Sequence, residues 1–288
     1  MSTVARISAP SKSRPHGPAA IGVDLRRFWA LTFTLASTEF KLRFFGSALG
    51  YLWTLMRPLL LFGVLYLVFA KVAHVNKSVA HYPVYLLTAI ILFTYFAEAA
   101  GGNVASLVMR ENLLRKMRFP RLVIPLSVSL TAVFNLATNL VVVLIFALAS
   151  GVSPRWSWFE LPVLIVLLVI FSTGVGMLLS AAYVRYRDIA PIWEVLQQLL
   201  FYGSGIFFIV ATLGGRLWFL GPTREVLLYN PLAAVFSEMH HAFLDPHAPT
   251  VAATLGVRIL IPLGIVFAAF GVGLWFFNRQ APRIAENL

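Results

Sequence analysis

The sequence contains no cysteine, which excludes disulfide bridges, cysteine-ligated metal centres and thiol catalysis. Charge is also scarce. Asp, Glu, Lys and Arg make up 12% of the 288 residues, whereas a soluble domain carries roughly 25%. Apolar residues make up 59%, and the mean hydropathy is +0.83. Such a chain cannot cover a water-facing surface with polar side chains. A soluble globule, a coiled coil and a disordered chain are therefore excluded, and an integral membrane protein remains.

Three catalytic signatures are absent as well. The sequence has no G-x-x-x-x-G-K-[ST] phosphate loop, no H-E-x-x-H pair and no G-x-S-x-G nucleophile elbow. We therefore expect this chain not to hydrolyse ATP by itself, and we expect neither a cofactor nor a metal ion in it.

Long apolar runs are present instead, and a membrane-spanning helix needs about 20 mostly apolar residues. Residues 122–154, 161–184, 195–215 and 259–278 contain no charged side chain, and two further runs are interrupted only by Glu98 and by Arg57-Pro58. The sequence predicts an all-α integral membrane protein with six transmembrane helices, at about 50–71, 83–107, 122–149, 161–184, 193–213 and 258–278.

The basic residues predict the orientation of these spans. On the six-span map, 17 of the 23 Lys and Arg residues lie on the side of the N-terminus and 6 on the opposite side. Short cytoplasmic loops are enriched in Lys and Arg, so we expect both termini in the cytoplasm. The net charge of +12 thus indicates topology, and no nucleic acid is expected as a partner.

The segments outside the spans have distinct compositions. Residues 1–23 are rich in Ser, Pro and Ala and are predicted to form a disordered cytoplasmic tail. Residues 24–45 mix aromatic with basic side chains, which predicts an amphipathic helix in the membrane interface, with an extension of the first span as the alternative. The last outer loop has an apolar run too short to span, which predicts short re-entrant helices. Residues 46–280 would form the membrane domain, and 281–288 a cytoplasmic tail.

Polar side chains inside the spans need partners, because lipid cannot supply them. One stripe has a polar residue at every fourth position, and it fits either the wall of a polar substrate pathway or hydrogen-bonded contact between helices: Ser127, Thr131, Asn135 and Asn139. A stripe of small residues, Ser172, Gly176 and Ser180, favours close helix packing. For Glu98 we favour a pair with an arginine near the cytoplasmic face over a proton relay.

Other side chains have both a functional and a structural interpretation. Aromatic residues in the spans fit either a surface on which sugar faces slide or ordinary core packing: Phe93, Tyr95, Phe96, Phe201 and Tyr202. Glu238 and His241 share a helix face and fit a metal or acid–base site, but no third ligand has a suitable spacing, so a polar patch is favoured. Residues 110–120 are short, basic and amphipathic, which favours a docking helix for a cytoplasmic partner over a plain basic loop.

Four short motifs in this order carry a resemblance: SALGYLW at 47–53 followed by Pro58, NLLRKMRFPR at 112–121 followed by Pro125, RYRDI at 185–189, and NPL at 230–232. Over about residues 24–280 the chain resembles the membrane subunit of type-two ABC exporters, specifically the permeases that export O-antigen, teichoic acid or capsular polysaccharide. Where that family often has Ser-Pro, this chain has Ser204-Gly205.

The resemblance implies a permease that is not itself an enzyme, in a bacterial cytoplasmic membrane. It implies a second copy of the chain, surrounding membrane lipids, and two cytoplasmic ATP-binding cassette subunits that hold ATP and Mg. A lipid-linked glycan would pass between the two permeases. The residues expected to couple to the ATPase are Arg26, Arg27, Arg110, Asn112, Leu113, Leu114, Arg115, Lys116 and Phe119. Those expected at an outer gate are Ser204, Gly205, Phe207, Phe208, Trp218, Asn230 and Pro231.

Two rival functions remain. One is an ABC exporter of drugs or small lipids from the same superfamily. The other is a membrane-bound glycan-modifying enzyme that would use Glu238 and His241.

Overall fold

The computed structural model describes residues 25–44, 50, 52–72, 79–111, 120–210 and 223–287, with the backbone alone at 44, 70–72, 223–224 and 281–287. These residues form helices and loops and contain no β-strand. The predicted tail at 1–23 lies outside them. Within the described ranges, five helical segments are long and apolar enough to cross a membrane: Leu52–Phe69, Tyr82–Val104, Val123–Ala149, Trp156–Arg185 and Val251–Gln280.

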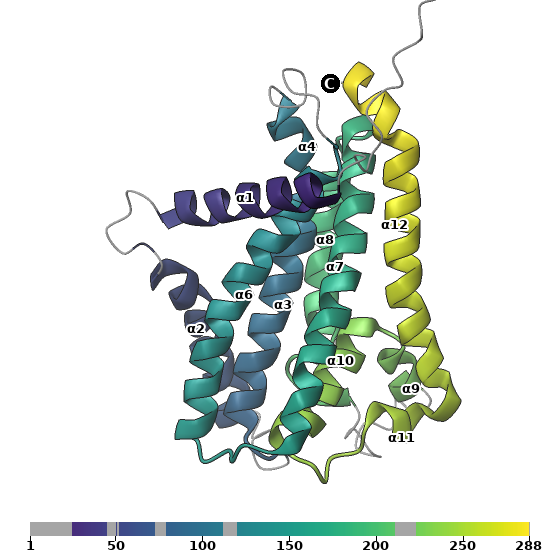
Figure 1. Ribbon diagram of the computed structural model, residues 1–288. Helices are drawn as coiled ribbons and strands as arrows, with labels where there is room; N and C mark the ends of the chain where they lie inside the picture. The colour runs from purple at the N-terminus through teal and green to yellow at the C-terminus, as the bar shows by residue number, and fades with distance from the viewer. Residues whose placement is uncertain are drawn as a thin grey trace, which may run out of the picture.

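In the described part of the chain, six long helices run side by side: α2 (Leu52–Tyr66), α3 (Tyr82–Val104), α6 (Val123–Ala149), α7 (Glu160–Arg185), α8 (Ile189–Gly203) and α12 (Leu260–Asn287). Helix α1 (Leu25–Phe44) lies across them (Figure 1). Helix α1, the short α4 (Ser106–Met109) and the C-terminus lie at one end, the α1 end. The other end, the α10 end, holds α9 (Thr223–Leu228), α10 (Pro231–Met239) and α11 (Val251–Leu255).

Helix α3 is the centre of the bundle and packs against α2, α6, α7 and α8. Of its membrane-length window, 78% is buried, against 6% for the window that contains α2. Pro83 in its first turn suits helix initiation, because the first amides of a helix have no partner within it. The largest apolar cluster among the described residues forms around α3, and the neighbouring helices pack against it.

Helices α7 and α12 approach each other closely through glycine. A Cβ atom at Gly273 would collide with the carbonyl oxygen of Gly174. On the neighbouring face of α7, Ser172 Oγ lies 3.0 Å from the Tyr95 hydroxyl of α3, and a Cβ at Gly176 would lie 2.7 Å from Asn103 Nδ2. The stripe of small residues therefore packs one helix against another, as its spacing predicts.

Helix α8 differs from the predicted span at 193–213. It begins four residues earlier, at Ile189, and ends at Gly203 after 15 residues. At about 1.5 Å per residue this is about 22 Å, less than the hydrocarbon core of a bilayer. The next residues explain the early end, since Gly205 adopts φ +73°, which helices do not tolerate. The uncharged run continues beyond this point, but the helix does not.

Candidate functional site

One face of α1 is buried against the bundle and changes character along its length. Phe28, Thr32 and Ala36 are almost completely buried, and Phe28 packs into an apolar cluster with residues of α4, α6, α7 and α12. The hydroxyl of Thr131 in α6 donates to the Ala36 carbonyl at 3.3 Å. Further along the same face come Glu39 and Arg43. The outer face of α1 exposes Trp29, Phe33 and Leu42 among others.

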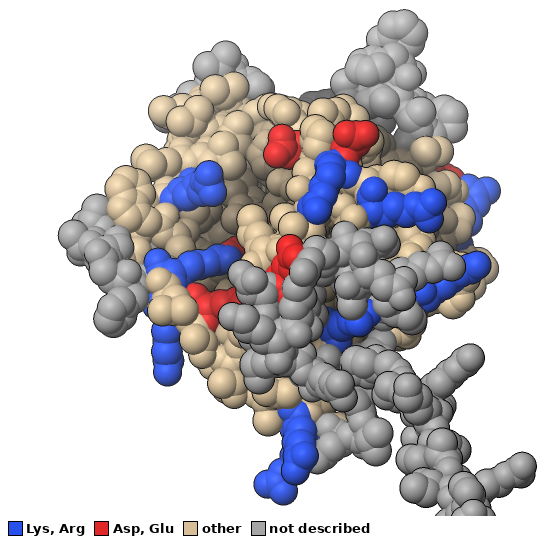
Figure 2. All heavy atoms as spheres, turned by 90° about the horizontal axis from the view of Figure 1, so that it is seen from above, with Lys and Arg blue, Asp and Glu red and all other residues tan. Residues whose placement is uncertain are grey.

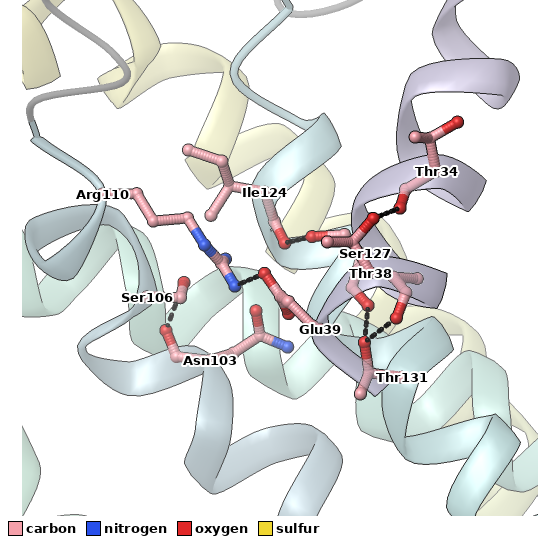
Figure 3. A network of polar contacts seen from close by, with 10 residues as sticks. Thr34, Thr38, Glu39, Asn103, Ser106, Arg110, Ile124, Ser127 and Thr131 are labelled. Atoms are coloured by element: carbon pink, nitrogen blue, oxygen red, sulfur yellow. Dashed lines mark hydrogen bonds and ion pairs between the residues drawn. The ribbon is translucent and has the colours of Figure 1, made fainter. Parts of the chain in front are cut away.

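Glu39 and Arg43 each form an ion pair with another helix. Glu39 pairs with Arg110, the residue that follows α4, and Arg43 pairs with Glu98 of α3. Figure 3 shows Arg110 and Glu39 pointing toward each other from their two segments. Burial lowers the pKa of the Arg43 guanidinium, and the nearby Glu39 carboxylate opposes that shift. The predicted pairing of Glu98 with an arginine is thus confirmed.

Glu98 has a second partner across the bundle. Asn135 Nδ2 of α6 donates to Glu98 Oε1 at 2.7 Å, so α1, α3 and α6 meet at one carboxylate. A carboxylate inside an apolar helix is costly unless it is paired. Here an arginine and an amide satisfy it together, which leaves no reason to assign it to a proton relay.

A polar hollow lies beside this carboxylate. It consists of two adjoining cavities of about 400 and 490 Å³, which share Arg57, Pro58, Thr94, Ala97 and Gln197. Its walls come from α1, α2, α3, α6 and α8, and charged and amide side chains alternate there with aromatic rings. Besides the shared residues, its lining includes Arg43, Trp53, Glu98, Asn135, Asn139, Phe93, Glu194, Gln198, Phe201 and Tyr202.

The polar stripe of α6 divides into two parts. Ser127 and Thr131 donate to backbone carbonyls of α6 and lie beneath α1, as Figure 3 shows. Asn135 and Asn139 line the hollow. Both interpretations of the stripe therefore have a physical counterpart. Thr131 and Asn135 connect α6 to other helices, and Asn135 and Asn139 face a cavity.

The aromatic candidates divide in the same way. Phe93, Phe201 and Tyr202 line the hollow, and Phe93 and Phe201 meet edge to face with ring centroids 5.0 Å apart. Tyr95 and Phe96 are buried in the core. The Tyr95 hydroxyl bonds Ser172, and the Phe96 ring stacks on Phe171 of α7. Core packing accounts for these two.

Ser204, Gly205, Phe207 and Asn230, which are expected at an outer gate, lie around the broken end of α8. Asn230 Nδ2 donates to Ser204 Oγ at 3.2 Å, and Asn230 Oδ1 caps α10 by accepting from the Leu232 amide. Two tyrosines of α3 satisfy the irregular backbone. Tyr85 donates to the Gly205 carbonyl at 2.6 Å and Tyr82 to the Phe207 carbonyl at 3.1 Å. Non-helical backbone at membrane depth is tolerated where protein groups bond it in this manner.

Other predicted site residues are placed as follows. Phe208 packs in the apolar cluster under α9 and α11, and Pro231 begins α10. Arg26 and Arg27 are exposed on the first turn of α1. Trp218 and the coupling candidates at 112–119 lie outside the described residues. Figure 2 looks onto the α1 end, where Lys and Arg side chains are spread over the face.

Glu238 and His241 both bond backbone groups close to the start of α11. Glu238 Oε2 accepts from the Val251 amide at 2.7 Å, and His241 Nδ1 lies 2.8 Å from the Ala248 carbonyl. No cluster of three or more metal-ligating side chains occurs among the described residues. Each of the two side chains thus bonds a separate piece of backbone at the α10 end, which favours the polar-patch interpretation.

The sequence did not single out the residues that define the hollow on α2 and α8. In the sequence, Arg57 is an interruption of a span, and no motif points to Glu194, Gln197 or Gln198. A signal was available, because Glu194, Gln197 and Gln198 come three and one residues apart and place polar groups on one side of α8.

Several apolar helices of membrane length beside an open polar hollow define a multi-pass helical membrane protein with a polar hollow in its surface. The chain belongs to the ABC-2 type transporter family, whose model matches residues 30–244. It is 28% identical over 266 residues to the O-antigen export system permease protein RfbA of Myxococcus xanthus, covering 92% of this chain and 98% of that protein. It is also 28% identical to RfbA of Klebsiella pneumoniae (92% and 97% covered) and 22% identical to the polysialic acid transport protein KpsM of Escherichia coli (84% and 91% covered).

Proposed function

We propose that this chain is the membrane-spanning permease of a bacterial ABC exporter that moves a lipid-linked polysaccharide across the cytoplasmic membrane. Family membership supports the transporter class, and the relatives named for O-antigen and polysialic acid export support the substrate class. The observation that carries the proposal is the polar hollow, whose amide, charged and aromatic lining suits hydroxyl groups and sugar faces.

We further propose that a second copy of the chain closes the hollow. Arg57, Glu194 and Gln198 are exposed on α2 and α8, within segments of otherwise apolar character. Lipid is a poor environment for such side chains, so they need either water or another protein surface. A pathway between two copies supplies both, with Asn135, Asn139, Phe93, Phe201 and Tyr202 along its walls.

The orientation and the driving force belong to the same proposal. The α1 end faces the cytoplasm, where α1 lies in the membrane interface and two ATP-binding cassette subunits contact residues from Arg110 onward. These subunits bind ATP and Mg. Helix α8 and the segment after it together make a sixth crossing, and α9 to α11 form re-entrant helices at the outer face. Arg26 and Arg27 are proposed to face the ATPase as well.

The test is to purify the chain together with an ATP-binding subunit and reconstitute the complex in lipid vesicles. We expect ATP hydrolysis to rise when a lipid-linked glycan is added, and the glycan to reach the vesicle lumen. Stimulation by drugs and not by glycan lipids would instead identify an exporter of small molecules. Activity without any ATPase that disappears in Glu238→Gln and His241→Ala would identify a membrane enzyme.

A further inference from the structure

Helix α3 is interrupted just before the segment proposed to meet the ATPase. It ends at Val104, Ala105 forms a turn, and α4 begins at Ser106. Gly101 and Gly102 come shortly before this break. Interruptions of the helical hydrogen-bond ladder and glycine pairs are where helices bend. A force applied beyond Arg110 would therefore bend the chain at Ala105 unless another element bridged the break.

Helices α6 and α7 pack against both α3 and α4, and α1 adds ion pairs on both sides of the break. Glu98 lies on the α3 side of the break and pairs with Arg43, whereas Arg110 lies on the α4 side and pairs with Glu39. Glu39 and Arg43 are four residues apart on α1, so their side chains are neighbours on one helix face. The result is a row of alternating charge, from Arg110 through Glu39 and Arg43 to Glu98. Asn135 of α6 bonds the last member.

These pairs are more protected than ordinary surface ion pairs. The side chains of Glu39, Glu98 and Arg110 are 21–24% exposed, and only Arg43 is more open, at 45%. Low exposure strengthens the attraction and makes it costly to leave one partner alone. The far end of the row also lines the polar hollow, through Arg43 and Glu98. The row thus joins the proposed ATPase contact to the proposed pathway.

We propose that α1 is a splint across the break at Ala105, and that Arg110, Glu39, Arg43 and Glu98 are positioning residues that carry displacement of the segment after Arg110 to the wall of the hollow. This proposal rests on the function proposed above. With the splint in place, α3, α4 and α1 move as one body. When an ion pair is removed, the break at Ala105 takes up the movement and ATP is consumed without export.

The experiment uses charge reversal in the reconstituted complex with its ATPase subunit. Arg43→Glu and Glu98→Arg, each alone, are expected to lower the ratio of glycan exported to ATP hydrolysed at least tenfold. ATP should still be hydrolysed in both variants, so that the fall in the ratio comes from lost export. The double variant restores opposite charges and should recover the ratio to within about threefold. Glu39→Arg and Arg110→Glu, alone and together, form a second set that is read by hydrogen exchange of the permease alone, because Arg110 is itself proposed to contact the ATPase.

The matched control is the pair Arg258–Glu225, which joins two segments at the α10 end. The same reversals there should leave the ratio unchanged. A readout on the permease alone separates the splint from the proposed function. Hydrogen exchange at residues 103–109 should accelerate in each single reversal and return in the double variant, whether or not any glycan is transported.

Failure of the proposed function and failure of the splint give different results. A wild-type complex that neither hydrolyses ATP nor exports glycan contradicts the proposed function, and the exchange measurement still tests the splint. Single reversals with unchanged exchange at 103–109, or with a normal export ratio, would overturn the splint. So would double reversals that bind the ATPase but recover neither exchange nor export.

Discussion

The two ends of the bundle are connected by different chemistry. At the α1 end, charged side chains of α1 meet charged side chains of α3 and of the residue after α4. At the α10 end, the ion pair Arg258–Glu225 is the more exposed, and uncharged donors bond the irregular backbone, as Tyr85 does at Gly205 and as Trp158 Nε1 does at Phe243, at 2.6 and 3.2 Å. The first kind of contact can exchange partners and responds to ionic strength. The second fixes a particular backbone conformation. We read the α1 end as built to transmit movement and the α10 end as built around one irregular segment.

The α10 end should be the more sensitive to a change in backbone shape. Gly205→Ala is expected to destabilise the protein by about 2–3 kcal/mol, because φ +73° strains a residue with a Cβ and that Cβ would lie 2.7 Å from Val210 Cγ2. Thermal unfolding in detergent would show a midpoint lower by several degrees. Gly203→Ala is the control, since a Cβ there meets nothing within 4 Å. Equal midpoints for both variants would mean that the turn after α8 tolerates other geometries.

Acid should weaken the α10 end. His240 is buried against the Tyr85 ring, and burial lowers its pKa to about 4, although Asp245 opposes the shift and His81 and His241 lie nearby. The folded protein holds this ring neutral while the unfolded chain binds a proton below about pH 6.5. Stability therefore falls as the pH drops from about 6.5 to about 4, by up to about 1.4 kcal/mol per pH unit.

The check is the unfolding midpoint measured across that pH window. His240→Phe keeps a ring beside Tyr85 and should flatten the pH dependence. His247→Gln changes an exposed histidine of the same segment and should leave the slope as it is. A slope that persists in His240→Phe would assign the pH dependence to other groups.

Added salt should weaken the α1 end and leave residues 204–210 at the α10 end unchanged. This is the smallest of the expected effects. Raising the ionic strength from about 0.05 to about 0.5 M shortens the Debye length severalfold and weakens partly exposed ion pairs by a few tenths of a kcal/mol each. Hydrogen exchange in the C-terminal half of α1 should quicken by a small factor, and exchange at 204–210 should not change. The same acceleration at both ends would remove the electrostatic distinction.

Much of this architecture was accessible from the sequence, because an uncharged run of membrane length has few alternatives to a spanning helix. The helices at 82–104, 123–149 and 160–185 follow from that argument. The end of α8 did not, since hydropathy averages over a window while a single positive φ at Gly205 ends a helix. The span count of six and the interfacial position of α1 stay predictions.

The site was less accessible, because its members come from five helices. The four-residue spacing located Asn135 and Asn139, and the isolation of Glu98 in a span correctly implied an arginine partner. Nothing in one sequence could say which arginine. Tyr95 and Phe96 are aromatic residues of the same helix turn as Phe93. They contact α7 and not the hollow, and the sequence does not show this difference.

The inner face of α1 also limits where residues can be inserted into or deleted from this protein. Phe28, Thr32, Ala36, Glu39 and Arg43 share a face only because their spacing follows the helical repeat. One inserted or deleted residue within that stretch would turn everything beyond it by about 100°. Phe28 would stay in its apolar cluster while both charges rotated away from Arg110 and Glu98. Interior length should therefore be the least variable property of α1, whereas the surface loop after α6 can grow or shrink without disturbing either pair.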